Sequence, residues 1–231
     1  MQGDKCPWLH EILKKQTLFK HPFDLSQLPQ NAIYFFYEDG EKCQGSTSNQ
    51  RIVRIGTAKQ ENFRSRIFEH YLFDEKKLIF DAYQPKPSDR SIFRKNIGRA
   101  ILNRKGDEYL FIWDIDFTKI KNRNKYQYFR DMAKEQDIEK EISNILRTTF
   151  SFRYLILENE FQRIGPCGLE NRLIGSVSNC SCCKPSSEWL GNYSPINKIR
   201  ISGLWQTQHL WTEEINDVDV VEIEESIKMF L

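Results

Sequence analysis

Long apolar runs are missing from this sequence, and no stretch reaches the roughly 20 apolar residues that a helix needs to cross a bilayer. The first residues, MQGDKCPWLHEILKK, also lack the basic segment, apolar stretch and cleavage site of a secretory signal. We therefore expect no membrane partner and a cytoplasmic location. Thiols stay reduced in the cytoplasm, which argues against disulfide bonds.

Cysteines are few and show no clear metal-binding pattern. Four of the six lie close together in the chain, at Cys167, Cys180, Cys182 and Cys183. The C-x-C-C order is not the paired C-x2-C pattern of a zinc site, and the two remaining cysteines, Cys6 and Cys43, have no evident partner. We favour reduced thiols in a loop, and zinc remains the less favoured alternative.

Net charge is also low, at +2, but it is unevenly distributed. Residues 86–105 hold seven Lys or Arg against one acid, and residues 117–134 hold six against one. The last twenty residues reverse this balance, with seven acids against Lys228. Clustered basic charge indicates that one face of the protein binds a polyanion, although many basic runs are simply solvated surface.

Aromatic residues make up 13% of the chain, which predicts a sizeable core and excludes a disordered protein. No change in composition marks a linker, so we expect residues 1–231 to form a single domain. Apolar periodicity predicts helices over residues 8–18, 61–73, 92–103, 137–147 and 168–179. Ser91 is the expected N-cap of the third of these. Strands are predicted over residues 32–38, 51–58, 109–117 and 150–157, and residues 218–224 are interpreted as a strand or a loose tail.

Four short motifs follow one another along these elements. Ala32-Ile33-Tyr34 lies on the first strand of a predicted hairpin and Arg54-Ile55-Gly56 on the second. Arg66 and His70 lie one turn apart on the next helix, and Glu170 begins a later helix. This order resembles the GIY-YIG nuclease superfamily, in its restriction-endonuclease-like prokaryotic branch. The blocks SIFRKNIGRAIL, LENRLIGSVSN, SEWLG and SGLW extend the resemblance over about residues 28–205.

The resemblance implies an α/β (α+β) fold with a small antiparallel sheet flanked by helices. It implies a nuclease core over residues 28–205, with an inserted basic region at 86–134 and an acidic C-terminal extension at 206–231. It also implies roles for four side chains. Tyr34 would act as general base or orient water, Arg66 would hold the scissile phosphate, Glu170 would bind a divalent metal, and His70 would assist proton transfer or steady the phosphate.

These roles agree with the chemistry of phosphodiester cleavage, which needs a proton acceptor, a cation for the transition state and often a carboxylate-bound Mg²⁺. A forked guanidinium grips phosphate oxygens in two places. Each residue also has an ordinary structural interpretation: a strand aromatic, a surface arginine, a buried helix histidine and a first-turn acid at a helix dipole. The order in which the four occur together favours function.

Two positions depart from the family pattern. Arg54 stands where the family has its second tyrosine, and we count it among the candidate catalytic residues because its charge would lie near the phosphate. Tyr37 is a poor substitute, because side chains alternate along a strand and it points to the face opposite Tyr34. Cys182 stands where the family often carries an asparagine.

We therefore expect a DNA endonuclease that depends on Mg²⁺ or Mn²⁺, of restriction or other defence type, and working as a homodimer. The basic region would hold the DNA backbone through Arg94, Lys95, Arg99, Lys121 and Arg123. One alternative is a catalytically impaired nucleic-acid-binding protein of the same fold. Another is a zinc-stabilised interaction protein built on the cysteine cluster.

Overall fold

The computed structural model describes residues 5–44, 50–58, 62–165 and 168–229. Cys167 and the middle of the predicted hairpin loop lie outside these ranges. A four-stranded sheet forms the centre of the fold, in the order β1-β4-β2-β3, with every neighbouring pair antiparallel. Its strands are β1 (Phe19–Lys20), β2 (Ile33–Glu38), β3 (Ile52–Thr57) and β4 (Phe150–Leu155). This confirms the expected antiparallel sheet.

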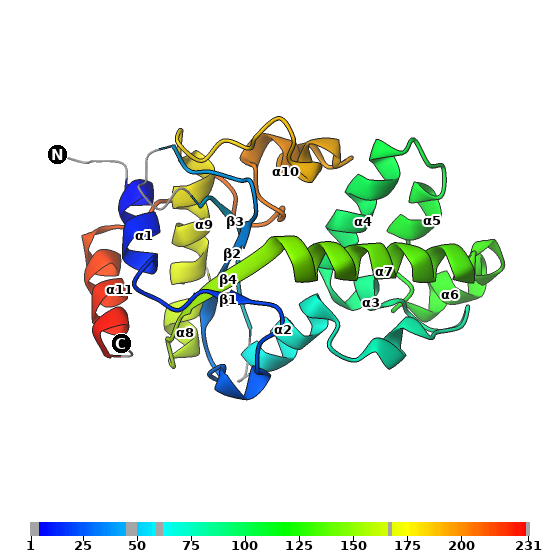
Figure 1. Cartoon of the computed structure of the whole chain (residues 1–231), viewed down its shortest axis with the longest axis horizontal. Helices are drawn as coiled ribbons and strands as arrows, with labels where there is room; N and C mark the ends of the chain where they lie inside the picture. The colour runs from blue at the N-terminus through cyan, green and yellow to red at the C-terminus, as the bar shows by residue number, and fades with distance from the viewer. Residues whose placement is uncertain (1–4, 45–49, 59–61, 166–167, 230–231) are drawn as a thin grey trace.

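Alternation along β2 gives the sheet two apolar faces. Tyr34 and Phe36 belong to one core, which we call the tyrosine face, and Ile33, Phe35 and Tyr37 belong to the other, which we call the cysteine face. Figure 1 shows three helices on the first side: α2 (Phe63–Tyr71), α4 (Ile92–Arg104) and α7 (Met132–Thr149). On the second side lie α1 (Lys5–Leu13), α9 (Leu169–Asn179) and α11 (Asp217–Met229).

Short elements complete the chain. The remaining helices are α3 (Pro87–Arg90), α5 (Leu110–Asp114), α6 (Ile120–Tyr126), α8 (Glu160–Arg163) and α10 (Asn197–Ser202). Single 3₁₀ turns are η1 (Leu25–Gln27), η2 (Glu75–Leu78), η3 (Gln127–Phe129) and η4 (Leu190–Tyr193). Within the described ranges, no helix is both long enough and apolar enough to span a bilayer.

The predicted hairpin is confirmed, and its register places Tyr34 opposite Gly56 and Phe36 opposite Arg54. A Cβ atom at Gly56 would overlap the ring of Tyr34, so the glycine makes room for the tyrosine across the strand pair. Tyr37 lies on the cysteine face, as expected. Ser91 is the N-cap of α4, where its hydroxyl accepts the backbone N–H of Arg94.

The predicted strand over residues 109–117 is wrong, because this segment contains helix α5. Asp107 accepts the backbone N–H of Tyr109 at 2.9 Å in the turn just before this helix. Only Trp113 of this helix is buried, and it packs so closely on Gly98 of α4 that a Cβ atom there would overlap its indole. This contact with α4 overrides the local β preference of the aromatic residues.

The acidic C-terminal segment is neither a strand nor a loose tail, since it forms helix α11. The side chain of Asn216 accepts the backbone N–H groups of Val218 and Asp219, which caps the start of the helix. Ile223 and Ile227, four residues apart, are buried in the cysteine face. The helical spacing of these two side chains, rather than the valine content, decides the structure.

Glu38 at the end of β2 joins the sheet to two later segments. Its Oε2 accepts the indole N–H of Trp189 and that of Trp205, each at 2.9 Å. Burial raises the pKa of Glu38 to about 7, against the opposing effect of the two indoles. These contacts explain why SEWLG and SGLW accompany the hairpin in the sequence.

Candidate active site

Tyr34 lies in a hydrogen-bonded chain that joins three elements. Its hydroxyl is 3.1 Å from Nε2 of His70, and Nδ1 of His70 is 2.8 Å from Oγ of Ser91. Strand β2 supplies the tyrosine, α2 the histidine and the N-cap of α4 the serine. A neutral imidazole has one N–H and one bare nitrogen, so this chain can move a proton between the phenol and the imidazole.

Burial and nearby positive charge set the protonation of this chain. Burial raises the pKa of Tyr34, and the charges of Arg54 and Arg66 oppose the rise. The pKa of His70 lies well below its ordinary value, first because of burial and then because of the charges of Arg54, Arg66 and Arg94. At neutral pH the phenol is therefore protonated and the imidazole is neutral.

A pocket of about 260 Å³ lies at edge strand β3. Its lining combines charged, amide and apolar side chains: Arg54, Ile55, Ile92, Glu170, Ile174, Gln206, Thr207, Gln208 and His209. Arg54 is fixed in the wall, because Nη1 donates to the carbonyl of Trp205 at 2.7 Å and the guanidinium lies 4.9 Å from the ring centre of Phe93. Tyr34 is only 1% exposed and does not line the pocket, but its side chain interacts with that of Arg54 in the wall.

Glu170 reaches the pocket from the first turn of α9. Burial raises its pKa to about 7, against the charge of Arg54, the backbone N–H of Thr57 and the charge of Arg163. Near neutral pH a proton therefore competes for this carboxylate, and a bound cation would favour its charged form. One or two carboxylates with water and substrate oxygens are a common Mg²⁺ arrangement. Glu170, with the amide of Gln208 in the same lining, therefore fits a hard divalent cation.

Arg66 lies one turn before His70 on α2, as the spacing predicts. Its guanidinium pairs with Glu69 at 3.0 Å and donates to the carbonyl of Arg90 at 3.4 Å. About 40% of its side chain is exposed, and its charge acts on both Tyr34 and His70. The five candidate catalytic residues therefore lie in one region of the fold, around the hairpin and the start of α9.

The basic side chains of α4 are not arranged as expected. Arg94 is fully buried, pairs with Glu139 of α7 at 2.7 Å and donates to the carbonyl of His70 at 3.0 Å. Lys95 is 5% exposed and pairs with Asp89 at 3.1 Å. The predicted exposed basic face is wrong at both positions, because carboxylates inside the fold neutralise these cations. Arg94 instead anchors the end of α2 that carries His70.

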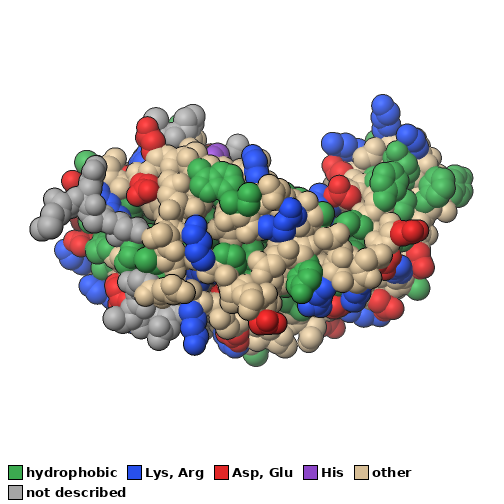
Figure 2. Space-filling model, turned by 90° about the horizontal axis from the view of Figure 1, so that it is seen from above, with side chains coloured by type: hydrophobic (Ala, Val, Ile, Leu, Met, Phe, Trp, Pro, Cys, Tyr) green, Lys and Arg blue, Asp and Glu red, His purple; other side chains and the backbone are tan. Residues whose placement is uncertain are grey.

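The other three residues expected to contact DNA lie nearer the surface. Nε of Arg99 donates to Asp114 at 2.6 Å. Lys121 is exposed on α6, and Arg123 donates to the carbonyl of Tyr83 at 3.2 Å. On the face shown in Figure 2, Lys and Arg side chains are spread among acidic and apolar ones. A DNA-binding role for these three residues stays a prediction.

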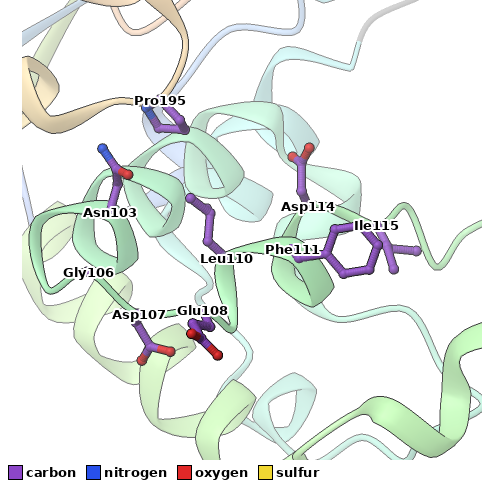
Figure 3. A pocket seen from close by; sticks show the side chains of 9 residues that line it. All are labelled: Asn103, Gly106, Asp107, Glu108, Leu110, Phe111, Asp114, Ile115 and Pro195. Atoms are coloured by element: carbon purple, nitrogen blue, oxygen red, sulfur yellow. The ribbon is translucent and has the colours of Figure 1, made fainter.

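A larger pocket, of about 610 Å³, lies away from the candidate catalytic residues. It is formed by the end of α4, by α5 and by Pro195 (Figure 3). Three carboxylates border it, those of Asp107, Glu108 and Asp114. Asp114 pairs with Arg99 and Asp107 with Lys134, and no candidate catalytic residue lines this pocket, so size alone does not make it the nuclease site.

Several neighbours of the site could not be assigned from the sequence. Ser91 is recognisable as an N-cap, but its contact with His70 depends on how α2 packs on α4. The side chain of Gln206 accepts the backbone N–H of Ile55 at 2.9 Å, within the second motif strand. Gln208 lines the pocket, whereas Cys182, at the position of the family asparagine, does not. The amides come from a segment beyond the expected nuclease core, where the sequence carries no motif.

Comparison with known families agrees with this geometry. The model of the GIY-YIG domain matches residues 7–229, nearly the whole chain. The chain therefore belongs to the GIY-YIG domain family, whose members are in general endonucleases. The match extends beyond residues 28–205 and includes most of α1 and all of α11. No curated protein and no solved structure matches the chain at a significant level.

Proposed function

We propose that this protein is a DNA endonuclease that hydrolyses phosphodiester bonds with Mg²⁺ or Mn²⁺, in a restriction or other defence role. The observation that carries the proposal is the Tyr34–His70 hydrogen bond beside a pocket that contains Arg54 and Glu170. A phenol with a proton acceptor, two guanidinium groups and a carboxylate are the components that phosphodiester cleavage needs. The substrate would be cytoplasmic DNA.

In the proposed reaction, Arg66 and Arg54 hold the scissile phosphate and offset the charge that develops on it. Tyr34 orients or deprotonates the attacking water, and His70 takes the phenolic proton at Nε2. The positive charges that depress the pKa of His70 are partly neutralised once a phosphate is bound, so substrate binding makes the imidazole a better acceptor. Arg94 keeps His70 in place through its backbone carbonyl.

Glu170 would hold the divalent cation, which when bound supplies Lewis-acid stabilisation of the phosphate oxygens. Because Tyr34 is buried and does not line the pocket, its hydroxyl must become accessible when substrate binds. The movement would be made by Arg54, whose guanidinium leaves the carbonyl of Trp205 for a phosphate oxygen. Hydrogen bonds at active sites often reach productive geometry only in the substrate complex. Cleavage of both strands would be served by a homodimer.

The burial of Tyr34 favours a second candidate function, a protein that binds nucleic acid without cleaving it. In that case Arg54 permanently covers the phenol and only grips phosphate. The two functions make different predictions for the same sample, because a binding protein shifts DNA in a gel but leaves supercoiled plasmid intact.

Incubation of the purified chain with supercoiled plasmid and Mg²⁺ tests the proposal. We expect nicked or linear product from the wild type and none from Glu170→Gln. Tyr37→Phe is the matched control, because it removes a buried tyrosine hydroxyl from the same strand on the opposite face. Intact plasmid with a gel shift that Glu170→Gln leaves unchanged would establish the binding-only function instead.

A further inference from the structure

Four cysteines from distant parts of the sequence meet in the core of the cysteine face. Cys6 lies on α1, Cys43 follows β2, Cys180 is the C-cap of α9, and Cys183 comes three residues later. All four residues are buried, with an exposed fraction of 3% or less. Such a cluster cannot result from local sequence preference, because three separate segments contribute to it.

The contacts among these sulfur atoms centre on Cys183, and the ligand atoms of Cys6, His10 and Cys183 lie within 4.8 Å of one another. Sγ of Cys183 is 3.5 Å from Sγ of Cys6 and 3.5 Å from Sγ of Cys43, and its thiol also contacts that of Cys180. The thiol of Cys6 contacts that of Cys180 as well. Zinc–thiolate bonds are about 2.3 Å long, which gives sulfur–sulfur distances of about 3.8 Å around a tetrahedral ion. The separations of Cys183 from Cys6 and from Cys43 are close to this value.

A set of disulfides explains the arrangement less well. A disulfide joins two sulfur atoms at about 2.05 Å and leaves no role for a third. Here Cys183 contacts three other thiols. A fourfold cluster of soft ligands is instead typical of structural zinc.

The sequence contained part of this signal. Cys180 and Cys183 form a C-x2-C knuckle, which the intervening Cys182 disguises as a C-x-C-C group. Cys182 is half-buried, and Cys167 lies outside the described residues. The partners of the knuckle, Cys6 and Cys43, could not be identified from spacing, because the sheet and α1 bring them to it.

We propose that Cys6, Cys43, Cys180 and Cys183 bind one structural zinc ion. His10 is a supporting residue, with Nε2 at 3.1 Å from Sγ of Cys183, where its N–H stabilises the thiolate. Four protein ligands leave no open position for substrate, so the ion holds the fold together rather than taking part in cleavage.

The ion would connect α1, the segment after β2 and the end of α9. Glu170 lies in the first turn of α9 and Cys180 is its C-cap, which separates them by about 15 Å at 1.5 Å per residue. The zinc site is therefore distinct from a cation at Glu170, and it would fix the helix that presents this carboxylate. A zinc-stabilised protein and a nuclease are compatible descriptions of the same chain.

The metal content of the full-length chain, purified without chelators, tests the proposal. We expect one zinc ion per chain, released by a thiol-modifying reagent. Cys183→Ser and Cys43→Ser each remove a direct ligand and should lower the zinc content well below one ion per chain. Cys182→Ser is the matched control, since it makes the same chemical change in the same loop and should retain the ion. His10→Gln should weaken binding by about 10- to 100-fold without changing the stoichiometry at saturating zinc.

If the cysteine variants fail to fold, a measurement on the wild-type chain still tests the proposal. Replacement of zinc by Co²⁺ should give the visible absorption of tetrahedral cobalt and the near-ultraviolet charge transfer of thiolate ligands. Wild-type protein without bound zinc and without this cobalt spectrum would overturn the proposal. Equal zinc loss in Cys182→Ser and Cys183→Ser, or a disulfide among the four cysteines, would overturn it too.

Discussion

The two faces of the sheet use the same strand for different purposes. On the tyrosine face, β2 contributes Tyr34, whose hydroxyl enters a polar chain with His70 and Ser91. On the cysteine face, its neighbours Ile33 and Phe35 pack in a core that contains the four clustered sulfurs. On the tyrosine face, arginine side chains lie near the ionisable groups of Tyr34 and His70. On the cysteine face, apolar side chains surround the cysteine sulfurs. Reactivity and structural support are separated by the alternation of a single strand.

Helix α9 connects these two regions. It packs its apolar side on the cysteine face, and its first turn carries Glu170 to edge strand β3, where the carboxylate accepts the backbone N–H of Thr57. Segments around Trp205 and Gln206 lie along the same edge and bond to β3. The pocket is therefore built where the two faces meet, at edge strand β3.

Loss of a reacting group on the tyrosine face should have the largest effect. Tyr34→Phe removes the hydroxyl that contacts His70, and we expect cleavage to fall by about 10²- to 10⁴-fold. Rates of plasmid cleavage at saturating Mg²⁺ check this. Far-ultraviolet circular dichroism of the variant should match the wild type. Cleavage by Tyr34→Phe within twofold of the wild type would remove this residue from the chemistry.

Arg94→Met should produce the next largest effect, on stability. The substitution leaves Glu139 buried without its charge partner, which costs about 3–5 kcal/mol. Urea denaturation measures the loss in the free energy of unfolding. The double variant Arg94→Met with Glu139→Met should recover part of it, because the unpaired charge is gone. A single variant as stable as the wild type would contradict the anchoring role of Arg94.

Glu38 predicts a smaller, pH-dependent effect. Its pKa is raised to about 7 in the folded protein from its ordinary value of 4.5, so the folded state binds the proton more tightly than the unfolded chain. The stabilisation is fully present below pH 4.5 and is lost as the pH rises through about 7. Glu38→Gln should remove this contribution to the loss of stability with rising pH, which thermal unfolding between pH 4.5 and pH 8 measures. Parallel pH profiles for the two proteins would contradict it.

The smallest effect is expected at exposed basic residues. Lys121→Ala should weaken DNA binding about equally for all sequences and lower the salt dependence by about one unit, if it contacts phosphate. Titrations of labelled DNA at several salt concentrations measure both quantities. Lys140→Ala is a matched control, because Lys140 is an exposed lysine on α7, outside the basic region. Identical salt slopes for the two variants would assign Lys121 to ordinary surface.

Much of the fold was predictable where local signals agree with packing. The hairpin, the Ser91 cap of α4 and the apolar side of α9 follow from patterns that each element carries by itself. The segment around Trp113 was not predictable in the same way, because its helix depends on the contact with Gly98. Arg94 shows the same limitation, since nothing in the basic run indicates that Glu139, 45 residues later, would pair with it in the core.

The candidate site also has a part that the sequence predicts and a part that depends on the packing of the fold. Tyr34, Arg66, His70 and Glu170 were identified by their order in the chain. Their distances, and the burial of Tyr34 beside Arg54, depend on how α2, α4 and α9 meet the sheet. The cysteine cluster required the structure most, because its four members come from three segments whose meeting is set by the whole fold.

The most direct test of this account measures zinc content and plasmid cleavage on the same samples of two variants. Glu170→Gln should lose cleavage and keep one zinc ion per chain, since Glu170 lies at the opposite end of α9 from Cys180. Cys183→Ser should lose the zinc ion and unfold at a lower temperature. Cleavage that persists in Glu170→Gln, or zinc that disappears with this carboxylate, would contradict the separation of a reactive region from a structural one.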